Sequence, residues 1–350
     1  MKRVAVPVVI LVALALVPEF EIDIPYVFGG GLSTPGTLQL LALCLMFGGL
    51  ALSYDLLFGF TGLLSFGHAL YFAVGVYVAA IAMTRWHWSF WEAVGFTALT
   101  GFVLAIVLGA VSLRVGGIAF AMVTLAFAQA GSILVLKNPY GWTGGEEGFG
   151  VDYHQLPSWA VGILNTKYLY WLALGYAAAV FVIVRWAVNS SPGHIWQAIR
   201  ENELRVQVLG LKPYTYKLMS FVLASLLATA GCIVYLLLLG GANTQVTTAS
   251  FTLTLLLMVV LGGTGSRWGA MIGGILYTYA DHRLGDLSSS STVSNLPSLF
   301  RTPMQQPLFI LGVLFILVVF FVPGGLTRIG QVGVRLDRIL RKPAVQEEPS

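Results

Sequence analysis

The chain has 350 residues, of which 57% are hydrophobic and 10% are charged, and its mean hydropathy is +0.83. A soluble globular domain carries about 25% charged residues, so this composition excludes an ordinary soluble protein. The formal net charge of +4 is small and is not gathered into an arginine-rich face. We therefore expect membrane lipid, and no nucleic acid, around this chain.

The apolar runs predict an all-α polytopic membrane protein with about ten transmembrane helices, since each crossing needs roughly 20 apolar residues. The first, eighth and ninth runs are short, and residues 251–280 also fit one bent hairpin that turns at a glycine-rich motif. In chain order, the expected spans are 4–17, 38–58, 62–83, 92–113, 116–136, 168–188, 218–239, 251–261, 268–280 and 308–322.

The distribution of positive charge predicts which loops are cytoplasmic, because lysine and arginine favour that side. With both termini cytoplasmic, the inner segments contain every lysine and arginine except Arg85, Lys137, Lys167, Arg283 and Arg301. The start of the chain also resembles a secretory signal, but its apolar run continues to Val17, so we expect an uncleaved anchor. Residues 1–330 then form one transmembrane domain, and 331–350 form a short cytoplasmic tail.

The third span is rich in small residues, whose ordinary role is close helix packing. The same residues could leave exposed backbone along a path for a polar solute. His68 is the readily ionisable residue deepest in a span, which makes it a functional candidate, although it could equally bond a neighbouring helix. Gln129 has the same two interpretations. The candidate residues of a translocation path are Ser65, Gly67, His68, Thr124, Gln129, Gly263 and Ser266.

Two loops outside the membrane carry further signals. The outer loop 137–167 contains Thr143-Gly-Gly-Glu-Glu-Gly148, which either meets a delivering protein, lines an outer gate, or is a glycine turn with solvated acids. The second outer loop, 281–307, carries a serine run. The inner loop 189–217 contains a charged segment in which Pro192 and Gly193 end the preceding helix, Ser191 caps the next, and Gly210 ends it. This segment predicts one short amphipathic helix, which either anchors the loop to lipid or docks a partner.

Several motifs resemble the LivM-type permeases of the branched-chain amino acid ABC transporter family. The resemblance covers roughly residues 38–325 and is specific because the motifs follow one another in family order. They are Gly59-Phe-Thr-Gly-Leu-Leu-Ser-Phe-Gly-His-Ala69, Phe120-Ala-Met-Val-Thr-Leu-Ala-Phe-Ala-Gln129, Thr143-Gly-Gly-Glu-Glu-Gly148, Ser191-Pro-Gly193 with Ala198-Ile-Arg-Glu-Asn202 and Leu209-Gly210, and Gly262-Gly-Thr-Gly-Ser266.

The resemblance implies a subunit of an importer in the inner membrane of a prokaryote. Its implied partners are a LivH-type sister permease, two cytoplasmic ABC ATPase subunits, and a periplasmic or lipid-anchored solute-binding protein. The inner loop is then the coupling loop, whose helix enters a cleft of the ATPase. In that picture Trp196 and Ile199 fill the pocket, and the polar rim consists of Arg200, Glu201, Glu203 and Arg205. The residues expected to couple to the ATPase are Trp196, Ile199, Arg200, Glu201, Glu203, Arg205 and Gly210.

The chain itself carries no phosphate-binding loop of the form G-x-x-x-x-G-K-[ST] and no nucleophile–base motif, so we expect a transport subunit and not an enzyme. ATP and Mg²⁺ are accordingly expected on the partner subunits, with no cofactor here. Cys44 and Cys232 lie in apolar runs, which indicates buried thiols and neither a disulfide nor a metal site.

Three alternatives remain open from the sequence. Relatives of the family carry urea or short amides, so the substrate class is not fixed by the motifs. An ion-coupled secondary transporter is a different class, but such proteins usually place acids, lysines or histidines along the membrane path. Ten helices also permit an inverted five-helix repeat, with the two glycine-rich motifs at 59–69 and 262–266 as symmetry partners at the cytoplasmic side.

Overall fold

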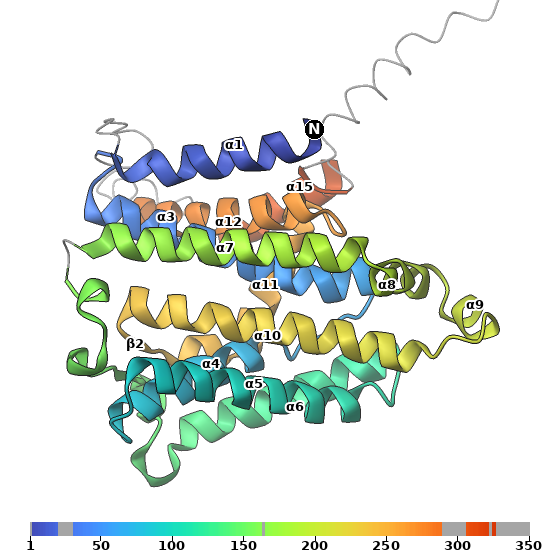
Figure 1. The fold of residues 1–350 in the computed structure, drawn as a ribbon, viewed down its shortest axis with the longest axis horizontal. Helices are drawn as coiled ribbons and strands as arrows, with labels where there is room; N and C mark the ends of the chain where they lie inside the picture. The colour runs from blue at the N-terminus through green and yellow to red at the C-terminus, as the bar shows by residue number, and fades with distance from the viewer. Residues whose placement is uncertain (1, 20–30, 163–164, 289–305, 322–323, 327–350) are drawn as a thin grey trace, which may run out of the picture.

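The computed structural model describes residues 2–19, 31–162, 165–288, 306–321 and 324–326. It is a bundle of long helices that lie side by side along one axis (Figure 1). In the described part of the chain, each expected span overlaps a helix. These helices are α1 (Lys2–Leu16), α3 (Pro35–Asp55), α4 (His68–Thr84), α5 (Phe90–Ser112), α6 (Ile118–Lys137), α7 (Thr166–Asn189), α10 (Pro213–Leu239), α11 (Ala249–Gly262), α12 (Arg267–Ser288) and α15 (Pro307–Phe321).

Among the described residues, five helical stretches are long and apolar enough to cross a membrane. They are Pro35–Thr61, Phe90–Ser112, Ile118–Lys137, Thr166–Asn189 and Pro213–Leu239. The chain is therefore a multi-pass membrane protein, while the number of ten crossings and the side of each terminus stay predictions. The expected tail, 331–350, lies outside the described residues.

Helix α3 forms the centre of the bundle, and 83% of its apolar stretch is buried. Small residues make this possible: a Cβ added at Gly274 of α12 would lie 2.8 Å from the Cα of Gly48. On another side of α3, a Cβ at Gly49 would lie 2.7 Å from the ring of Tyr176 in α7. Without side chains at these points, the backbones approach closely and gain dispersion contacts, as in other membrane bundles.

The helix expected at 62–83 is shorter than the sequence indicated. Helix α3 continues into a π-helical turn, η2 (Leu56–Thr61), which ends at Gly62 with a φ of 79°. Residues 63–67 form no helix, and α4 begins only at His68. Gly62 supplies the left-handed conformation that reverses the chain at little steric cost. The apolar run is continuous across this break, which is why hydropathy alone did not locate it.

The first outer loop is folded against the bundle. Short helical turns η3 (Pro139–Gly141), η4 (Gly145–Glu147), η5 (Tyr153–Gln155) and η6 (Ser158–Ala160) follow α6. Strand β1 (Phe149–Gly150) pairs antiparallel with β2 (Gly241–Ala242), which follows α10 and precedes η8 (Thr244–Thr247). Asn138 Oδ1 accepts from the backbone N–H groups of Thr143 and Gly144, at 2.8 and 3.2 Å. The glycine motif is thus an ordered turn, with exposed Glu146 and Glu147 side chains.

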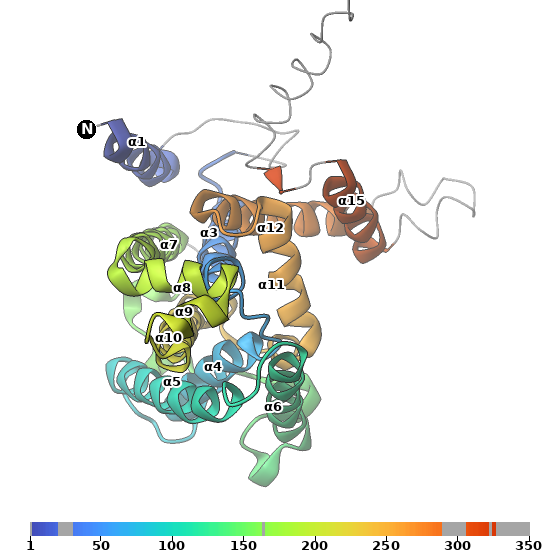
Figure 2. The ribbon, with the colours of Figure 1, turned by 90° about the vertical axis from the view of Figure 1, so that its right-hand side faces the viewer.

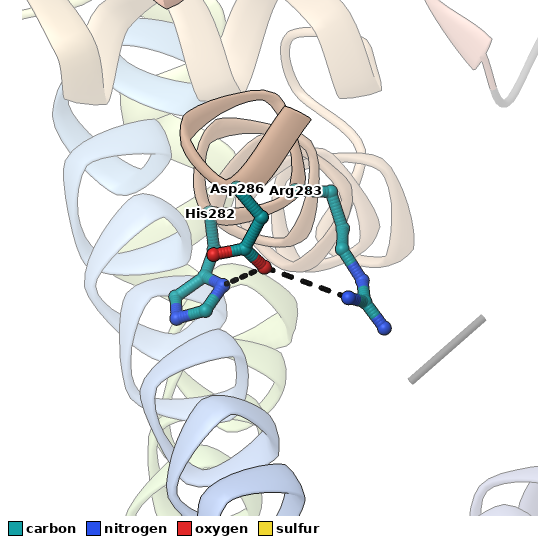
Figure 3. A network of polar contacts seen from close by, with 3 residues as sticks. All are labelled: His282, Arg283 and Asp286. Carbon is teal, nitrogen blue, oxygen red and sulfur yellow. Dashed lines mark hydrogen bonds and ion pairs between the residues drawn. The ribbon is translucent and has the colours of Figure 1, made fainter. Parts of the chain in front are cut away.

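Helix α12 extends further than expected, because the sequence placed a loop from residue 281. Figure 3 shows the reason in the last turns of α12: His282 Nδ1 lies 3.4 Å from Asp286 Oδ2, and Arg283 Nη1 lies 3.5 Å from the same atom. Partners spaced three and four residues apart meet on one helix face and support helical structure. Residues 289–305, which include most of the serine run, lie outside the described residues.

Candidate functional site

The inner loop forms two helices, α8 (Ser191–Glu201) and α9 (Glu203–Val208), and not the single helix that the sequence indicated. Asn202 has an extended backbone (φ −160°, ψ 102°) and interrupts the helix. Its Oδ1 accepts from the Arg205 N–H at 3.1 Å, so it caps α9. Asparagine is a favoured capping residue, and this local bond competes successfully with a continuous helix.

The start of α8 also differs from the prediction. Ser190, not Ser191, is the N-cap, and its Oγ accepts from the Gly193 N–H at 3.4 Å. Pro192 and Gly193 therefore lie in the first turn of α8, where proline is tolerated because its missing N–H has no helical partner. Figure 1 places α8 at one end of the long helices and α9 beyond that end, and Figure 2 looks onto the same end.

The apolar face of α8 is covered by the chain itself. Trp196 and Ile199 are both buried, and the Trp196 indole N–H donates to the Tyr216 carbonyl of α10 at 2.8 Å. In this conformation the chain itself covers both side chains, and their expected contact with a pocket of a partner stays a prediction. An amphipathic helix buries its apolar face on the nearest apolar surface, which here is the helix bundle.

The exposed apolar surface of the loop belongs to α9 instead. Leu204, Val208 and Leu209 are 70%, 87% and 78% exposed. An ion pair of 2.6 Å between Glu203 and Lys217 joins the base of α9 to α10. We call these three apolar residues the α9 knob. Their spacing of four and five residues was visible in the sequence, but the expectation had assigned the apolar contact to α8.

The polar residues expected on the rim divide between two environments. Glu201 and Arg205 are exposed, in keeping with a rim position, whereas Glu203 pairs with Lys217. Gly210 follows α9 with a φ of 81° and ends the loop helix region. Coupling to an ATPase through any of these residues stays a prediction.

Arg200 turns towards the bundle. Its Nη1 donates to the carbonyl of Gly59 in η2. Its side-chain stem lies over Gly62, where an added Cβ would be 3.0 Å from Arg200 Cγ. A Cβ at Gly265 would lie 2.8 Å from Arg200 Nη1. The guanidinium therefore lies between two glycine-rich segments that are about 200 residues apart in sequence.

Asp55, at the end of α3, also contacts the glycine-rich segment that contains Gly265. It is fully buried at the end of α3, and its Oδ1 accepts from the Gly265 N–H at 2.9 Å. A Cβ at Gly59 would overlap that same Oδ1. Asp55, Gly59, Gly62, Arg200 and Gly265 form what we call the junction. It joins α8, the end of α3 and the turn between α11 and α12.

The expected path residues Gly263 and Ser266 belong to this turn. Gly263 has a φ of 115°, and Ser266 Oγ accepts from the Gly269 N–H at 3.2 Å, which starts α12. The participation of Asp55 was not predicted. Its signal was a lone acid near the inner end of the expected span 38–58, four residues before Gly59.

Asp55 gives a test of how the junction is held. With Asp55→Leu, the Gly265 N–H loses its acceptor, and an unsatisfied buried donor costs about 1–3 kcal/mol of folding stability. Asp55→Asn keeps an acceptor oxygen at the same position, and we expect it to stay within 1 kcal/mol or so of the wild type. Thermal unfolding of the protein in detergent measures both. Equal losses in the two variants would show that the carboxylate charge, and not its acceptor role, holds the turn.

A second polar group surrounds the start of α4. His68 is fully buried and its Nε2 lies 3.0 Å from Ser53 Oγ of α3. Thr124 Oγ1 of α6 accepts from the Phe66 N–H at 3.1 Å, and Ser65 Oγ accepts from the Gly67 N–H at 3.2 Å. Side chains thus satisfy the irregular backbone of 62–67, as non-helical backbone inside a membrane protein requires.

The structure brings four of the seven expected path residues together here: Ser65, Gly67, His68 and Thr124. Gln129 is exposed on α6, away from them. Tyr54 connects this group to the junction, because it precedes Asp55 and its hydroxyl donates to the Ser65 carbonyl at 3.1 Å. In this conformation His68 is packed against α3 and faces no open path, so its role in transport stays a prediction.

The structure also shows the state of the cysteines and of the side chains that could ligate a metal. Among the described residues, no group of three or more histidine, cysteine, aspartate or glutamate side chains could hold a metal ion. Cys44 and Cys232 are buried free thiols. The junction places Arg200 of the surface helix α8 against η2 at the end of α3 and against the turn between α11 and α12.

Comparison with known proteins agrees with this architecture. The model of the family described as "branched-chain amino acid transport system / permease component" matches residues 36–319. The LivM permease protein of the high-affinity branched-chain amino acid transport system of Escherichia coli (strain K12) is 26% identical over 278 residues. A probable branched-chain amino acid transport permease protein LivM of Methanocaldococcus jannaschii is 23% identical over 331 residues.

The matches cover most of this chain but differ in how much of each relative they span. They cover 73% of the chain and 65% of the Escherichia coli protein, and 83% of the chain and 94% of the Methanocaldococcus jannaschii protein. The chain thus spans about two thirds of the length of the bacterial relative. No solved structure shows a significant match to the chain.

Proposed function

The chain belongs to the family of branched-chain amino acid permease components, and from this we propose that it is a LivM-type permease subunit of an ATP-driven importer in the inner membrane of a prokaryote. Its substrates in this proposal are branched-chain amino acids. It shares the translocation path with a LivH-type sister permease, receives substrate from a solute-binding protein, and is driven by two ABC ATPase subunits that hold ATP and Mg²⁺.

The observation that carries the proposal is the position of α8 and α9. Helix α8 lies at one end of the bundle and α9 projects beyond that end, where it presents three exposed apolar side chains to the outside. Clusters of this kind, surrounded by polar residues, are typical of protein interfaces, where a few apolar anchors provide most of the affinity. An ATPase seated on the α9 knob would move the junction through α8, because Arg200 connects α8 to the membrane helices.

The test is co-purification of the tagged chain from mild detergent. The variant Leu204→Ser/Val208→Ser removes two apolar side chains, and we expect at least about tenfold less ATPase to co-purify, since burial of a leucine or valine side chain contributes about 1.5–3 kcal/mol. Gln207→Ala, an exposed residue of the same helix, is the matched control and should retain the ATPase. A wild-type protein that purifies without any ATPase or second permease would instead indicate an ion-coupled secondary transporter.

The substrate proposal has a separate test. The chain is expressed in a strain that lacks it. Uptake of labelled leucine, isoleucine and valine by these cells is then compared with their uptake of urea and acetamide. Restored uptake of the amino acids supports the proposal. Restored uptake of urea or the amide alone supports the alternative substrate class and leaves the assignment as a permease in place.

A further inference from the structure

A cavity on the outside of the bundle lies between α1, α7 and α12. Its volume is about 450 Å³, and apolar side chains from all three helices line it, among them Leu11 and Leu14 of α1, Ala178 and Val182 of α7, and Ile272 of α12. Figure 2 shows α1 standing apart from α7 and α12 on this side of the molecule. Two hydrogen bonds hold α1 in place: the Tyr170 hydroxyl and the Trp171 indole donate to α1 carbonyls, at 2.7 and 3.1 Å.

One end of this cavity is positively charged. Arg185 is the charged residue of its lining, and the neighbouring lining residue Trp268 packs on Phe181, with ring centroids 4.7 Å apart. Arg267 directly precedes Trp268. Its guanidinium contacts Asn189, one helical turn after Arg185 on α7, so the two arginines lie at the same end of the cavity. Burial, and after it the positive charge of Arg185, lowers the pKa of the Arg267 guanidinium.

No carboxylate compensates this pair in the described part of the chain. The ion pairs found there involve neither Arg185 nor Arg267. The contact of Arg267 is with the neutral Asn189 Oδ1, at 3.4 Å. Two partly buried cations without a counterion favour an anion bound between them.

The position of the pair along the helices indicates what the anion is. Arg185 lies one turn before α7 ends at Asn189, next to α8, and Arg267 begins α12 just after the junction. Both arginines are therefore at the α8 end of the bundle. The cavity extends from there to Leu174, which is 11 residues before Arg185, or about 16 Å along a helix. That length is about half of a hydrocarbon core of roughly 30 Å, and so matches one leaflet.

We propose that this cavity binds one anionic phospholipid of the inner leaflet. Its phosphodiester lies between Arg185 and Arg267, one acyl chain fills the apolar groove along α7, and the Trp268 indole lies at the headgroup level. An acyl chain satisfies the apolar lining, which a free phosphate ion does not. The inner leaflet is the source of anionic headgroups at this end, where basic pockets between helices are suited to bind them.

Native mass spectrometry of the purified, assembled transporter tests the proposal, with phosphatidylglycerol and phosphatidylcholine as the two probes. The wild type is expected to retain phosphatidylglycerol in preference to phosphatidylcholine. Arg185→Gln/Arg267→Gln should lower phosphatidylglycerol retention by about tenfold or more, since each hydrogen bond to a charged group contributes about tenfold or more to binding. Arg114→Gln, an exposed arginine elsewhere on the chain, should leave it unchanged.

Two further variants separate binding from folding. Arg185→Lys/Arg267→Lys keeps both charges and should retain much of the phosphatidylglycerol, whereas Ala178→Trp fills the groove and should release the lipid although both arginines remain. Subunit assembly is checked for each variant by size-exclusion chromatography. Glycerol 3-phosphate, which has the phosphate without acyl chains, should displace no lipid.

The proposal is overturned by any of four results. These are equal retention of the two lipids by the wild type, unchanged retention in the double glutamine variant, displacement by glycerol 3-phosphate, and binding to the isolated chain but not to the assembled transporter. The last result would mean that a partner subunit covers the groove. None of the four depends on which solute is transported, so the lipid site can fail while the proposed function stands.

Discussion

With Arg200→Ala, uptake by the assembled transporter is expected to fall by about tenfold or more while ATP hydrolysis continues. Arg200 is the residue of α8 whose side chain bonds η2 and lies against the α11–α12 turn. A hydrogen bond to a charged group contributes about 1.5–3 kcal/mol, which corresponds to about one to two orders of magnitude in a coupling equilibrium. Parallel measurement of ATP hydrolysis and labelled substrate uptake in proteoliposomes gives the ratio of the two.

Two controls sharpen this prediction. Arg114→Ala removes another exposed arginine that makes no contact with the junction and should leave the ratio unchanged. Arg200→Lys keeps the charge but not the planar guanidinium, so it should recover only part of the coupling. If Arg200→Ala abolished ATPase binding itself, the residue would belong to the partner's docking surface and not to the junction. That outcome would return Arg200 to the rim role indicated by the sequence.

The helices themselves were largely predictable, because a membrane span needs a long apolar run, and each expected span overlaps a helix in the described part of the chain. What hydropathy could not show was where an apolar run stops being helical. The break at residues 62–67 is stabilised by Thr124 and Ser65, which accept its free N–H groups, and by Tyr54, which donates to a free carbonyl. Thr124 and Tyr54 come from two other helices, α6 and α3, so their contribution is a tertiary effect, whereas Ser65 belongs to the break itself.

The residues expected to couple to the ATPase also show what the sequence alone could not predict. The sequence indicated an amphipathic segment with Trp196 and Ile199 on its apolar face, and both do share the buried face of α8. It could not show whether that face meets the chain or a partner, since both surfaces are apolar. The break at Asn202 then produced a second helix, in which Leu204 and Val208 remain exposed together with the C-cap Leu209.

In an inverted repeat of this chain, the two glycine-rich motifs at 59–69 and 262–266 could not be the symmetry partners that the sequence indicated. Asp55 and Gly265 are hydrogen-bonded, so the two motifs lie at the same end of the bundle, whereas an axis in the membrane plane places partners at opposite ends. Two 27-residue stretches, Pro35–Thr61 and Pro213–Leu239, are better candidates. Each is followed by an irregular segment and a shorter helix, α4 or α11. The repeat remains a prediction in this revised form.

A large loss of folding stability is expected from a substitution where α11 crosses α12. A Cβ at Gly273 would overlap the Met258 carbonyl and lie 2.8 Å from the Cα of Gly262. Both neighbours are backbone atoms, which cannot rotate away as a side chain can. The helices must therefore separate, and overpacking of this kind costs about 1–3 kcal/mol, occasionally more. We expect Gly273→Ala to lower the unfolding temperature of the detergent-purified protein clearly.

Gly95→Ala is the matched control, because a Cβ at that position of α5 meets nothing within 4 Å. Alanine is the better helix former by about 1 kcal/mol, so this variant should be as stable as the wild type or slightly more so. The separation of α11 from α12 also shifts the turn that holds Gly265, so Gly273→Ala should weaken the junction as well and lower uptake. A Gly273→Ala protein that matches Gly95→Ala in stability would show that the two helices are not in backbone contact.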